Sequence, residues 1–232
     1  RRRFVTPEHL EPLAKVLKPG SIFRVATDIP DYVRQTLEEV PRAGFEWLAA
    51  RPADWVMSAI DVDRKEADRL RKHYWETYGT TLAGLMAEHD VDPGPYLTKV
   101  HDIDFGHLEQ DHTLAARITA LPGRKIVYTN GSAPYAKNVL QARGLDQVFD
   151  AVYGVEDAGF RPKPDHGAFR AVFGTDGLDP QRAAMFEDDP RNLKAPHQMG
   201  MKTVHVAETP VAEPHIHHHT DDLEHFLAQL IR

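Results

Sequence analysis

Cysteine is absent from the 232 residues of this chain. Its absence excludes disulfide bonds, thiolate metal sites and cysteine nucleophiles. Long apolar runs are also missing, so we expect no membrane-spanning helix and no membrane partner. The Arg-rich start is followed by a mixed helical pattern rather than by the apolar stretch of a signal peptide, and the sequence therefore predicts a cytoplasmic protein.

The chain also lacks an overall positive charge. Its formal net charge is −7, whereas a general nucleic-acid binder uses clustered Lys and Arg to neutralise phosphates. The charge therefore argues against nucleic acid as a partner, although residues 1–24 carry a local basic excess. Hydrophobic residues make up 41% of the chain and charged residues 27%, proportions that are typical of a globular protein.

Hydrophobic periodicity divides the chain into a helical part and an alternating part. Residues 64–90 show helical spacing, and their candidate buried positions are Leu70, Tyr74, Trp75, Leu82, Leu85 and Met86. The prolines of residues 92–95 indicate a turn. Beyond residue 120 we expect strands at 125–129, 149–153, 183–187 and 202–206, which alternate with helices at 134–143, 165–173, 190–199 and 220–231. This alternation predicts an α/β fold with a parallel sheet.

Three short polar segments adjoin the expected strands. Thr129 ends the first and Asn130 follows it, Lys163 stands between two prolines, and Asp188 and Asp189 follow a later strand. Ligands of open parallel sheets bind at the carboxyl ends of the strands, so we expect these segments to meet there. They would supply a hydroxyl and N–H groups for phosphoryl oxygens, a cation for developing negative charge and hard oxygen ligands for Mg²⁺. Each segment alone is also typical of a turn, a solvated lysine or a helix N-terminus.

In this order the segments resemble the motifs of a known family. Residues from about Val56 to Arg232 are similar to the haloacid-dehalogenase superfamily, and specifically to the branch of pyrimidine 5'-nucleotidases. Residues 74–82 resemble the helical cap of that branch, and the three polar segments match the second, third and fourth motifs of the superfamily. The resemblance implies a three-layer Rossmann-like parallel sheet with an inserted helical cap.

The resemblance also implies an activity, that of a Mg²⁺-dependent phosphate monoester hydrolase that works through an aspartyl-phosphate. The expected substrate is a small phosphorylated molecule, a nucleoside monophosphate. Thr129 and Asn130 would bind the phosphoryl oxygens, and Lys163 would stabilise the charge of the transition state. Asp188 and Asp189 would hold the metal, with Glu187 in support.

The first motif of the superfamily, D-x-D-x-T, is missing from the chain. In the family its first Asp attacks phosphorus and its second is a general acid and base. Residues 61–63 repeat the Asp-x-Asp spacing but precede a helix, so we expect them to cap that helix. Asp28 ends the apolar strand expected over residues 22–27 and is our candidate nucleophile. Pro30 occupies the place of the second Asp.

Residues 1–55 resemble a different family. Residues 2–5, 17–20 and 26–28 are similar to the C-terminal part of tRNA (guanine-N7) methyltransferases, whose glycine-rich S-adenosylmethionine site lies upstream and is not found in this sequence. Alternatively, residues 1–55 are a generic helix–strand–helix unit that fills the place of the lost first strand. We expect a junction of two truncated genes or a fragment of a fusion.

The expected organisation has three parts: a methyltransferase-like C-terminal fragment at 1–55, a helical cap at 56–115 and a haloacid-dehalogenase-like core at 116–232. Three interpretations of the function remain open. The chain is a phosphatase, a catalytically dead phosphate-binding remnant, or a tRNA-methyltransferase fragment that binds RNA through Arg1–Arg3.

A run of histidines lies near the end of the chain, at residues 215–219. One interpretation is a metal-binding segment, with Asp221 and Asp222 as the nearest further ligands. The other is a loop that leads into the last helix, with Thr220 as its N-cap and the two aspartates in its first turn.

Overall fold

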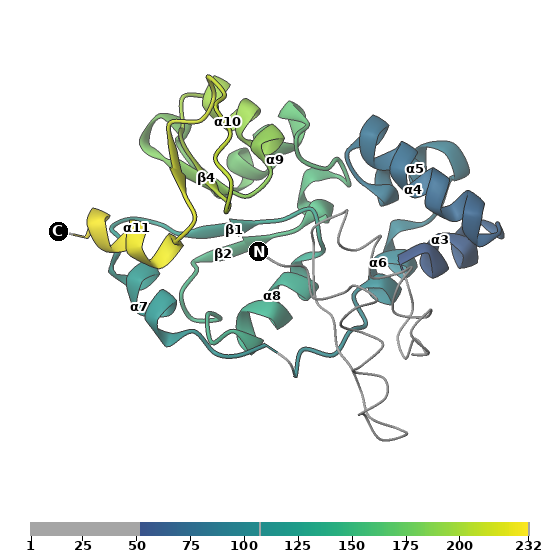
Figure 1. Cartoon of the computed structure of the whole chain (residues 1–232), viewed down its shortest axis with the longest axis horizontal. Coiled ribbons are helices and arrows are strands. Elements are labelled where there is room, and N and C mark those ends of the chain that lie inside the picture. Colours follow the sequence, from purple (N-terminus) through teal and green to yellow (C-terminus); the bar gives the residue numbers. More distant parts are fainter. Residues whose placement is uncertain (1–51, 107, 232) are drawn as a thin grey trace, which may run out of the picture. The chain divides into compact units, whose positions relative to one another are not determined.

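The computed structural model describes residues 52–106 and 108–231 (Figure 1). The chain divides into two compact units, Arg1–Pro52 and Ala53–Arg232. Asp28, Arg1–Arg3 and the strand expected over residues 22–27 lie outside the described residues. The organisation expected from the sequence, with boundaries at 55 and 115, stays a prediction.

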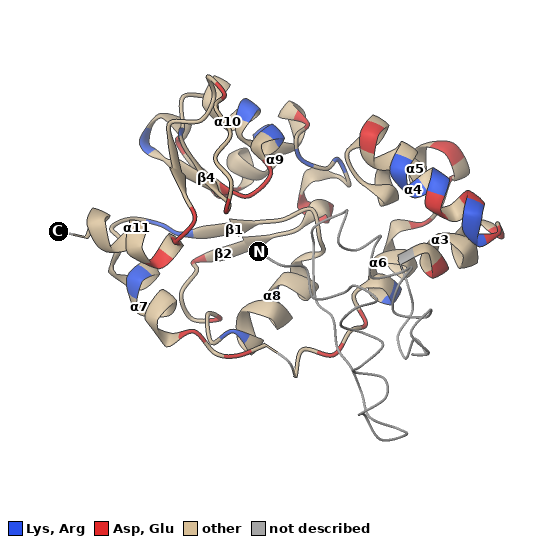
Figure 2. Ribbon diagram, viewed as in Figure 1, with Lys and Arg blue, Asp and Glu red and all other residues tan. Residues whose placement is uncertain are grey.

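Four helices open the second unit. They are α3 (Pro52–Ile60), α4 (Arg64–Tyr78), α5 (Thr81–His89) and α6 (Pro93–Val100). The carboxylate of Asp63 accepts the N–H of Glu66 at 2.9 Å and caps α4, so the expectation that residues 61–63 cap a helix is confirmed. The ribbon of α4 carries both basic (blue) and acidic (red) positions in Figure 2, and two pairs of them form i,i+3 ion pairs, Arg69 with Glu66 and Arg71 with Asp68.

The helices α3, α4 and α5 share a small apolar core, whose most buried members are Ala53, Val56, Ala67, Leu70, Tyr74 and Leu85. The predicted burial of Trp75 is wrong, because its side chain is 49% exposed. Successive helical residues point about 100° apart, so the neighbour of a fully buried Tyr74 faces another direction. The turn predicted at residues 92–95 is also wrong. Asp92 caps α6 there, since proline is tolerated in the first turn of a helix.

The rest of the unit alternates between strands and helices. After α7 (His112–Ala120) come β1 (Ile126–Tyr128), α8 (Ala133–Ala142), β2 (Ala151–Tyr153), α9 (His166–Asp176), β3 (Ala184–Glu187), α10 (Lys194–Gln198), β4 (Lys202–Val206), β5 (His218–Thr220) and α11 (Leu223–Leu230). Three short 3₁₀ turns, η1 (Val155–Ala158), η2 (Pro180–Arg182) and η3 (Pro190–Leu193), interrupt the loops. Every strand pair among the described residues is parallel, which confirms the predicted α/β class.

The strands of the described part form two sheets. β1 pairs with β2, and β3, β4 and β5 pair in that order. Helices α9 and α10 pack on one side through a cluster that contains Tyr128, Phe169 and Met201. On the other side α11 places Phe226 against Phe186 of β3, with ring centroids 6.0 Å apart. The strands therefore lie between two layers of helices (Figure 1).

The C-terminal segment differs from the prediction. His218–Thr220 forms β5, which pairs with β4 in the register Val204↔His218. The last helix therefore begins later than expected, and its N-cap is Asp222, which accepts the N–H of His225, rather than Thr220. None of the described helices is both long and apolar enough to cross a membrane.

Candidate functional site

The loop after β1 is folded by its own hydroxyl groups. The N–H of Thr129 donates to the carbonyl of Tyr153 on β2 at 3.0 Å, and its Oγ1 accepts the N–H of Gly131 at 3.0 Å. Ser132 then caps α8 by accepting the N–H of Tyr135. Because the Thr129 oxygen accepts within the loop, its O–H proton remains available to a ligand.

The side chain of Asn130 fixes the backbone of Lys163. Its Nδ2 donates to the Lys163 carbonyl at 3.1 Å, and its Oδ1 accepts the Lys163 N–H at 2.7 Å. Both ends of the amide are thus engaged. The side chain therefore positions Lys163, while its second Nδ2–H and the backbone N–H of Asn130 are the donors that remain for a phosphoryl group.

Lys163 links the end of β1 to the end of β3. It is 7% exposed, and its Nζ donates to the carbonyl of Tyr128 at 3.3 Å and forms an ion pair with Glu187, which is equally buried. A buried charge is tolerated when a counter-charge and hydrogen bonds compensate its lost hydration. The structure therefore brings together Asn130, Lys163 and Glu187, which lie far apart in the sequence.

The acidic loop, Glu187–Asp189, carries three carboxyl groups whose pKa values are shifted in different directions. Burial acts to raise the pKa of Glu187, but the charge of Lys163 and hydrogen bonds from Asp188, Lys163 and the Asp189 backbone together outweigh it, so this pKa lies below its ordinary value. A hydrogen bond with Glu187 raises the pKa of Asp188 instead. Burial also acts on Asp189, where hydrogen bonds from Arg191 prevail and lower the pKa. Negative charge is therefore fixed on Glu187 and Asp189.

The acidic loop fits a metal ion only in part. Its oxygens are the donors that Mg²⁺ prefers, but that ion takes an octahedral set of ligands. Asp189 is already engaged by Arg191, whose Nη2 lies 2.6 Å from Oδ2 and whose N–H lies 2.9 Å from Oδ1. Within residues 52–106 and 108–231, no three His, Asp or Glu side chains gather into a metal-binding group. The described residues therefore do not complete a Mg²⁺ site.

Two buried histidines support the acidic loop from behind. His205 of β4, 2% exposed, donates from Nε2 to the Asp188 carbonyl at 3.0 Å. His215 likewise donates from Nε2 to the Pro190 carbonyl at 2.8 Å. Sequence reasoning missed both roles. The histidine run was weighed only as a metal segment or a loop, although a histidine inside the expected strand at 202–206 was a signal of a buried polar contact.

The end of α4 approaches both loops of the site. The guanidinium of Arg191 lies over the ring of Trp75, 3.9 Å from its centroid. The backbone of Gly79 lies against the loop of Lys163, since a Cβ built on Gly79 would be 3.3 Å from the Lys163 carbonyl. The helical part thus contributes to the surroundings of the candidate phosphoryl-binding residues.

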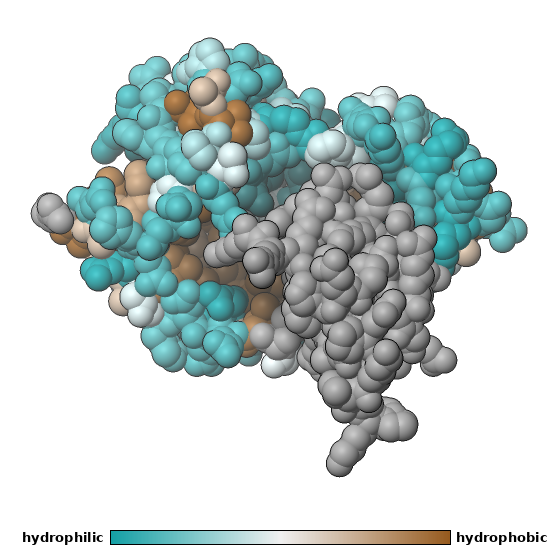
Figure 3. All heavy atoms as spheres, viewed as in Figure 1, coloured by the Kyte–Doolittle hydropathy of each residue, from teal (hydrophilic) through white to brown (hydrophobic). Residues whose placement is uncertain are grey.

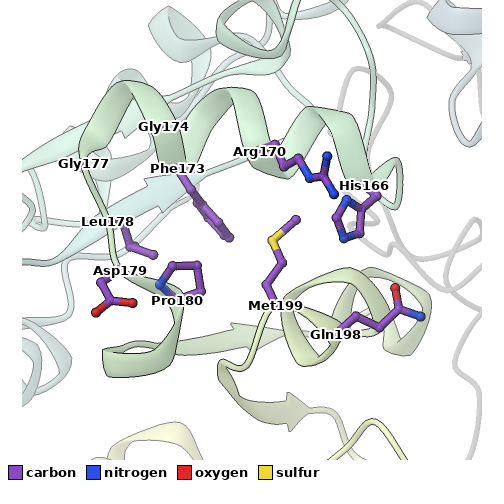
Figure 4. Close-up of a pocket in the computed structure, with 10 residues that line it drawn as sticks. All are labelled: His166, Arg170, Phe173, Gly174, Gly177, Leu178, Asp179, Pro180, Gln198 and Met199. Atoms are coloured by element: carbon purple, nitrogen blue, oxygen red, sulfur yellow. The ribbon is translucent and has the colours of Figure 1, made fainter.

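A separate hollow of about 650 Å³ lies along α9, and Figure 4 shows its lining residues. Arg170 and His166 stand at one end and Asp179 and Pro180 at the other, with Phe173 and Met199 between them (Figure 4). It shares no residue with the loops of Thr129, Lys163 and Asp188. The candidate phosphoryl site is therefore defined by the strand-end loops and not by this hollow.

The N-terminal region is similar to part of a methyltransferase. The tRNA (guanine-N(7)-)-methyltransferase of Ruegeria pomeroyi is 94% identical over 55 residues, which are 24% of this chain and 23% of that protein. The enzyme of the same name from Azorhizobium caulinodans is 52% identical over 56 residues, 24% of each chain. The match spans about a quarter of the length of these curated relatives.

The chain is also similar in fold to solved structures over about three quarters of its length. A dehalogenase crystal structure aligns with a TM-score of 0.50 and 16% identity, over 78% of this chain and 92% of that one. A haloacid-dehalogenase phosphatase from Thermococcus onnurineus aligns with a TM-score of 0.52 and 16% identity, over 77% and 86%. Residues 123–206 match the family model described as haloacid dehalogenase-like hydrolase. That segment contains Thr129, Lys163, Asp188 and Asp189, and these residues therefore lie in a domain that is similar to a haloacid dehalogenase-like hydrolase.

Proposed function

We propose that this domain is a phosphate monoester hydrolase that acts on nucleoside monophosphates, as pyrimidine 5'-nucleotidases do. The observation that carries the proposal is the placement of Lys163, a buried cation between the carboxyl ends of β1 and β3, each of which is a strand of a parallel sheet. This is the edge of a parallel sheet at which ligands bind. A fixed cation there is suited to the negative charge that develops on a transferring phosphoryl group.

The neighbouring groups support the same assignment. The hydroxyl of Thr129 has a free proton for a phosphoryl oxygen, and the backbone N–H of Asn130 is our second proposed donor. Asp188 and Asp189 stay our proposed Mg²⁺ ligands. Binding of the ion would require further ligands and would have to displace Arg191 from Asp189. The nucleotide preference rests on the resemblance of residues 74–82 to a nucleotidase cap.

The attacking group is the part that the described residues do not supply. Asp28 remains our proposed nucleophile, and it lies outside the described residues. A carboxylate that attacks phosphorus would release the alcohol and leave an acyl phosphate for water to hydrolyse. Without it, the same loops would bind phosphate and not turn it over, which is the remnant interpretation.

A turnover assay separates these possibilities. An aryl phosphate and a panel of nucleoside monophosphates are offered to the full chain with Mg²⁺ and with chelator, in parallel with Asp28→Asn and Asp63→Asn. We expect chelator-sensitive hydrolysis that Asp28→Asn abolishes. Asp63→Asn should leave it unchanged, because asparagine caps a helix as well as aspartate does. Phosphate binding by a folded protein without hydrolysis would establish the remnant instead.

A tRNA-methyltransferase fragment is a second candidate, because of the high identity of the N-terminal region. It predicts binding of tRNA through Arg1–Arg3, with an affinity that falls as salt is raised. Replacement of these three arginines by glutamine should then weaken tRNA binding in a filter or mobility assay. Equal binding by both proteins would exclude this candidate.

A further inference from the structure

His101 follows α6 and contacts the loop that follows β1. It is the C-cap residue of α6, and its Nδ1 lies 3.1 Å from the hydroxyl oxygen of Ser132. Its ring stacks on that of Tyr135, with centroids 4.1 Å apart and planes inclined by 10°. A ring that is held by both a stack and a hydrogen bond has a fixed direction for its second nitrogen.

That second nitrogen faces the space above Gly131. A Cβ built on Gly131 would lie 3.6 Å from His101 Nε2 and 3.5 Å from Thr129 Oγ1. The two polar atoms therefore flank the same point, which the ring of Tyr135 borders at 3.2 Å and which no side chain of residue 131 occupies. The hydroxyl of Thr129 is the group to which we assigned a phosphoryl oxygen.

The hydrogen bonds around Ser132 are compatible with a proton on Nε2 of the imidazole. Ser132 Oγ accepts the N–H of Tyr135, and when its O–H donates to Nδ1 of His101, the ring proton is on Nε2. Burial lowers the pKa of His101, with a smaller opposing effect from Glu156, and favours this neutral ring. Within the described residues Nε2 has no hydrogen-bond partner.

We propose that His101 donates a hydrogen bond from Nε2 to the anionic group of a ligand held by the Thr129 loop, and so is a substrate-binding residue. The inference rests on the proposed function and deepens it. The phosphoryl group would be contacted by the segment between α6 and α7 as well as by the strand-end loops. Tyr135 and Ser132 then act as positioning residues for His101.

Two substitutions distinguish ligand binding from a structural role. Asparagine keeps a polar atom near Nδ1 and loses the donor at Nε2, whereas the longer glutamine amide reaches the Nε2 position. With inorganic phosphate as the probe in calorimetry, we expect His101→Asn to weaken binding about tenfold, a loss within the range for a hydrogen bond to a charged group. His101→Gln should stay within about threefold of the wild type. A structural role through Ser132 predicts the reverse order.

The control variant is His112→Asn, at the exposed start of α7, which should bind phosphate as the wild type does. A second measurement needs no variant. In protein with ¹⁵N-labelled histidine, added phosphate should shift the Nε2 resonance of His101 and leave that of His112 in place. Phosphate binding with an unmoved His101 signal, or with equal affinity in His101→Asn, would overturn the inference and leave the hydrolase proposal standing.

The two proposals can fail separately. Phosphate binding that shifts His101 but leads to no hydrolysis would support the role of His101 and remove the hydrolase. A wild-type protein that binds no phosphate at all would overturn the role of His101 and the phosphoryl site together.

Discussion

The helical part of the described unit, α3 to α6, and its sheet part, β1 to α11, differ in how fully their apolar residues are buried. In the helices α3–α5, Val56, Tyr74 and Leu85 are 0% exposed, and the small core closes on itself. In the sheet part, Ile126 and Val127 of β1 are only half-buried, and so is every residue of β2. Figure 3 shows hydrophobic surface in the region where Figure 1 draws β1, β2 and α11.

The difference follows from the geometry of the two elements. A helix satisfies its backbone hydrogen bonds internally, whereas the backbone groups of a strand are paired by neighbouring strands. Among the described residues β1 and β3 each pair on one side only. What connects their ends is a side chain, Lys163, which reaches Tyr128 and Glu187. The site therefore contributes to the stability of the sheet part, whereas the core of α3–α5 contains no residue of the site.

The largest expected effect tests this link directly. Lys163→Met would leave the carboxylate of Glu187 buried without a counter-charge, and we expect the free energy of unfolding to fall by about 3 kcal/mol. Urea denaturation measures the loss. Native-state hydrogen exchange should locate it in β1 and β3 rather than in α4 and α5.

The matched control is the double variant Lys163→Met/Glu187→Leu. An apolar pair of similar volume removes the unpaired charge, so most of the stability should return, while phosphate binding should remain lost. A single Lys163→Met variant as stable as the wild type would show that the link between β1 and β3 is not needed.

The helical part can be disrupted on its own. A Cβ on Gly84 of α5 would lie 2.1 Å from Cγ of the buried Tyr74, so Gly84→Ala forces α4 and α5 apart. We expect it to cost about 3 kcal/mol, the upper end for an overpacked core. Hydrogen exchange should show faster opening of α4 and α5, and phosphate affinity should change little.

Gly174→Ala is the control in the sheet part. Gly174 lies in α9, and a Cβ there would meet no atom within 4 Å. Alanine should therefore stabilise the helix by about 0.5–1 kcal/mol. Equal effects of the two substitutions would mean that the close approach of Gly84 to Tyr74 does not limit the packing of this part.

The sequence predicted the elements that are decided locally. β4 begins and ends at the predicted residues 202 and 206, and α8 differs by one residue at each end. The errors arise where tertiary contacts decide. Trp75 fits the apolar pattern of α4 but faces Arg191. The histidine run forms β5 because β4 offers a partner, and such pairing cannot be read from polar residues.

In the candidate site, too, the sequence did not predict the features that depend on tertiary contacts. Motif order indicated Thr129, Lys163 and the acidic loop, and the structure brings Lys163 to Glu187. It could not indicate that the side chain of Asn130 is used to fix Lys163. Nor could it indicate His101, whose partners Ser132 and Tyr135 lie more than 30 residues away. Contacts of this kind depend on how the helical and sheet parts meet.

A smaller loss of stability is expected when the buried carboxylate of Asp176, in the sheet part, is replaced. Hydrogen bonds from Arg124, and also from Tyr153, lower the pKa of Asp176, against a partial opposing effect of burial. Its side chain is 1% exposed, while that of Arg124 is 51% exposed and screened by water. We expect Asp176→Asn to cost about 1 kcal/mol at pH 7.

The contribution of Asp176 to stability depends on pH in a definite direction. A carboxyl whose pKa is lowered on folding stabilises the protein above its unfolded pKa of about 3.9. This contribution is lost as the pH falls through the lower folded value. The gap in stability between the wild type and Asp176→Asn should therefore close below about pH 4. The exposed Asp146→Asn serves as control, and a gap that persists in acid would contradict the assignment.

The smallest expected effect comes from a contact between the helical part and the sheet part. The guanidinium of Arg191 stacks on the exposed ring of Trp75, and such pairs contribute about 0.5–1 kcal/mol at exposed sites. A double-mutant cycle of Trp75→Leu and Arg191→Met should give a coupling of that size in urea denaturation. Arg191 also binds Asp189, so its single substitution carries a second loss that only the cycle removes. A coupling of zero would mean that the stack adds no stability, and that the contact between the helical and sheet parts depends on the buried cluster of Leu82, Leu97 and Val155 instead.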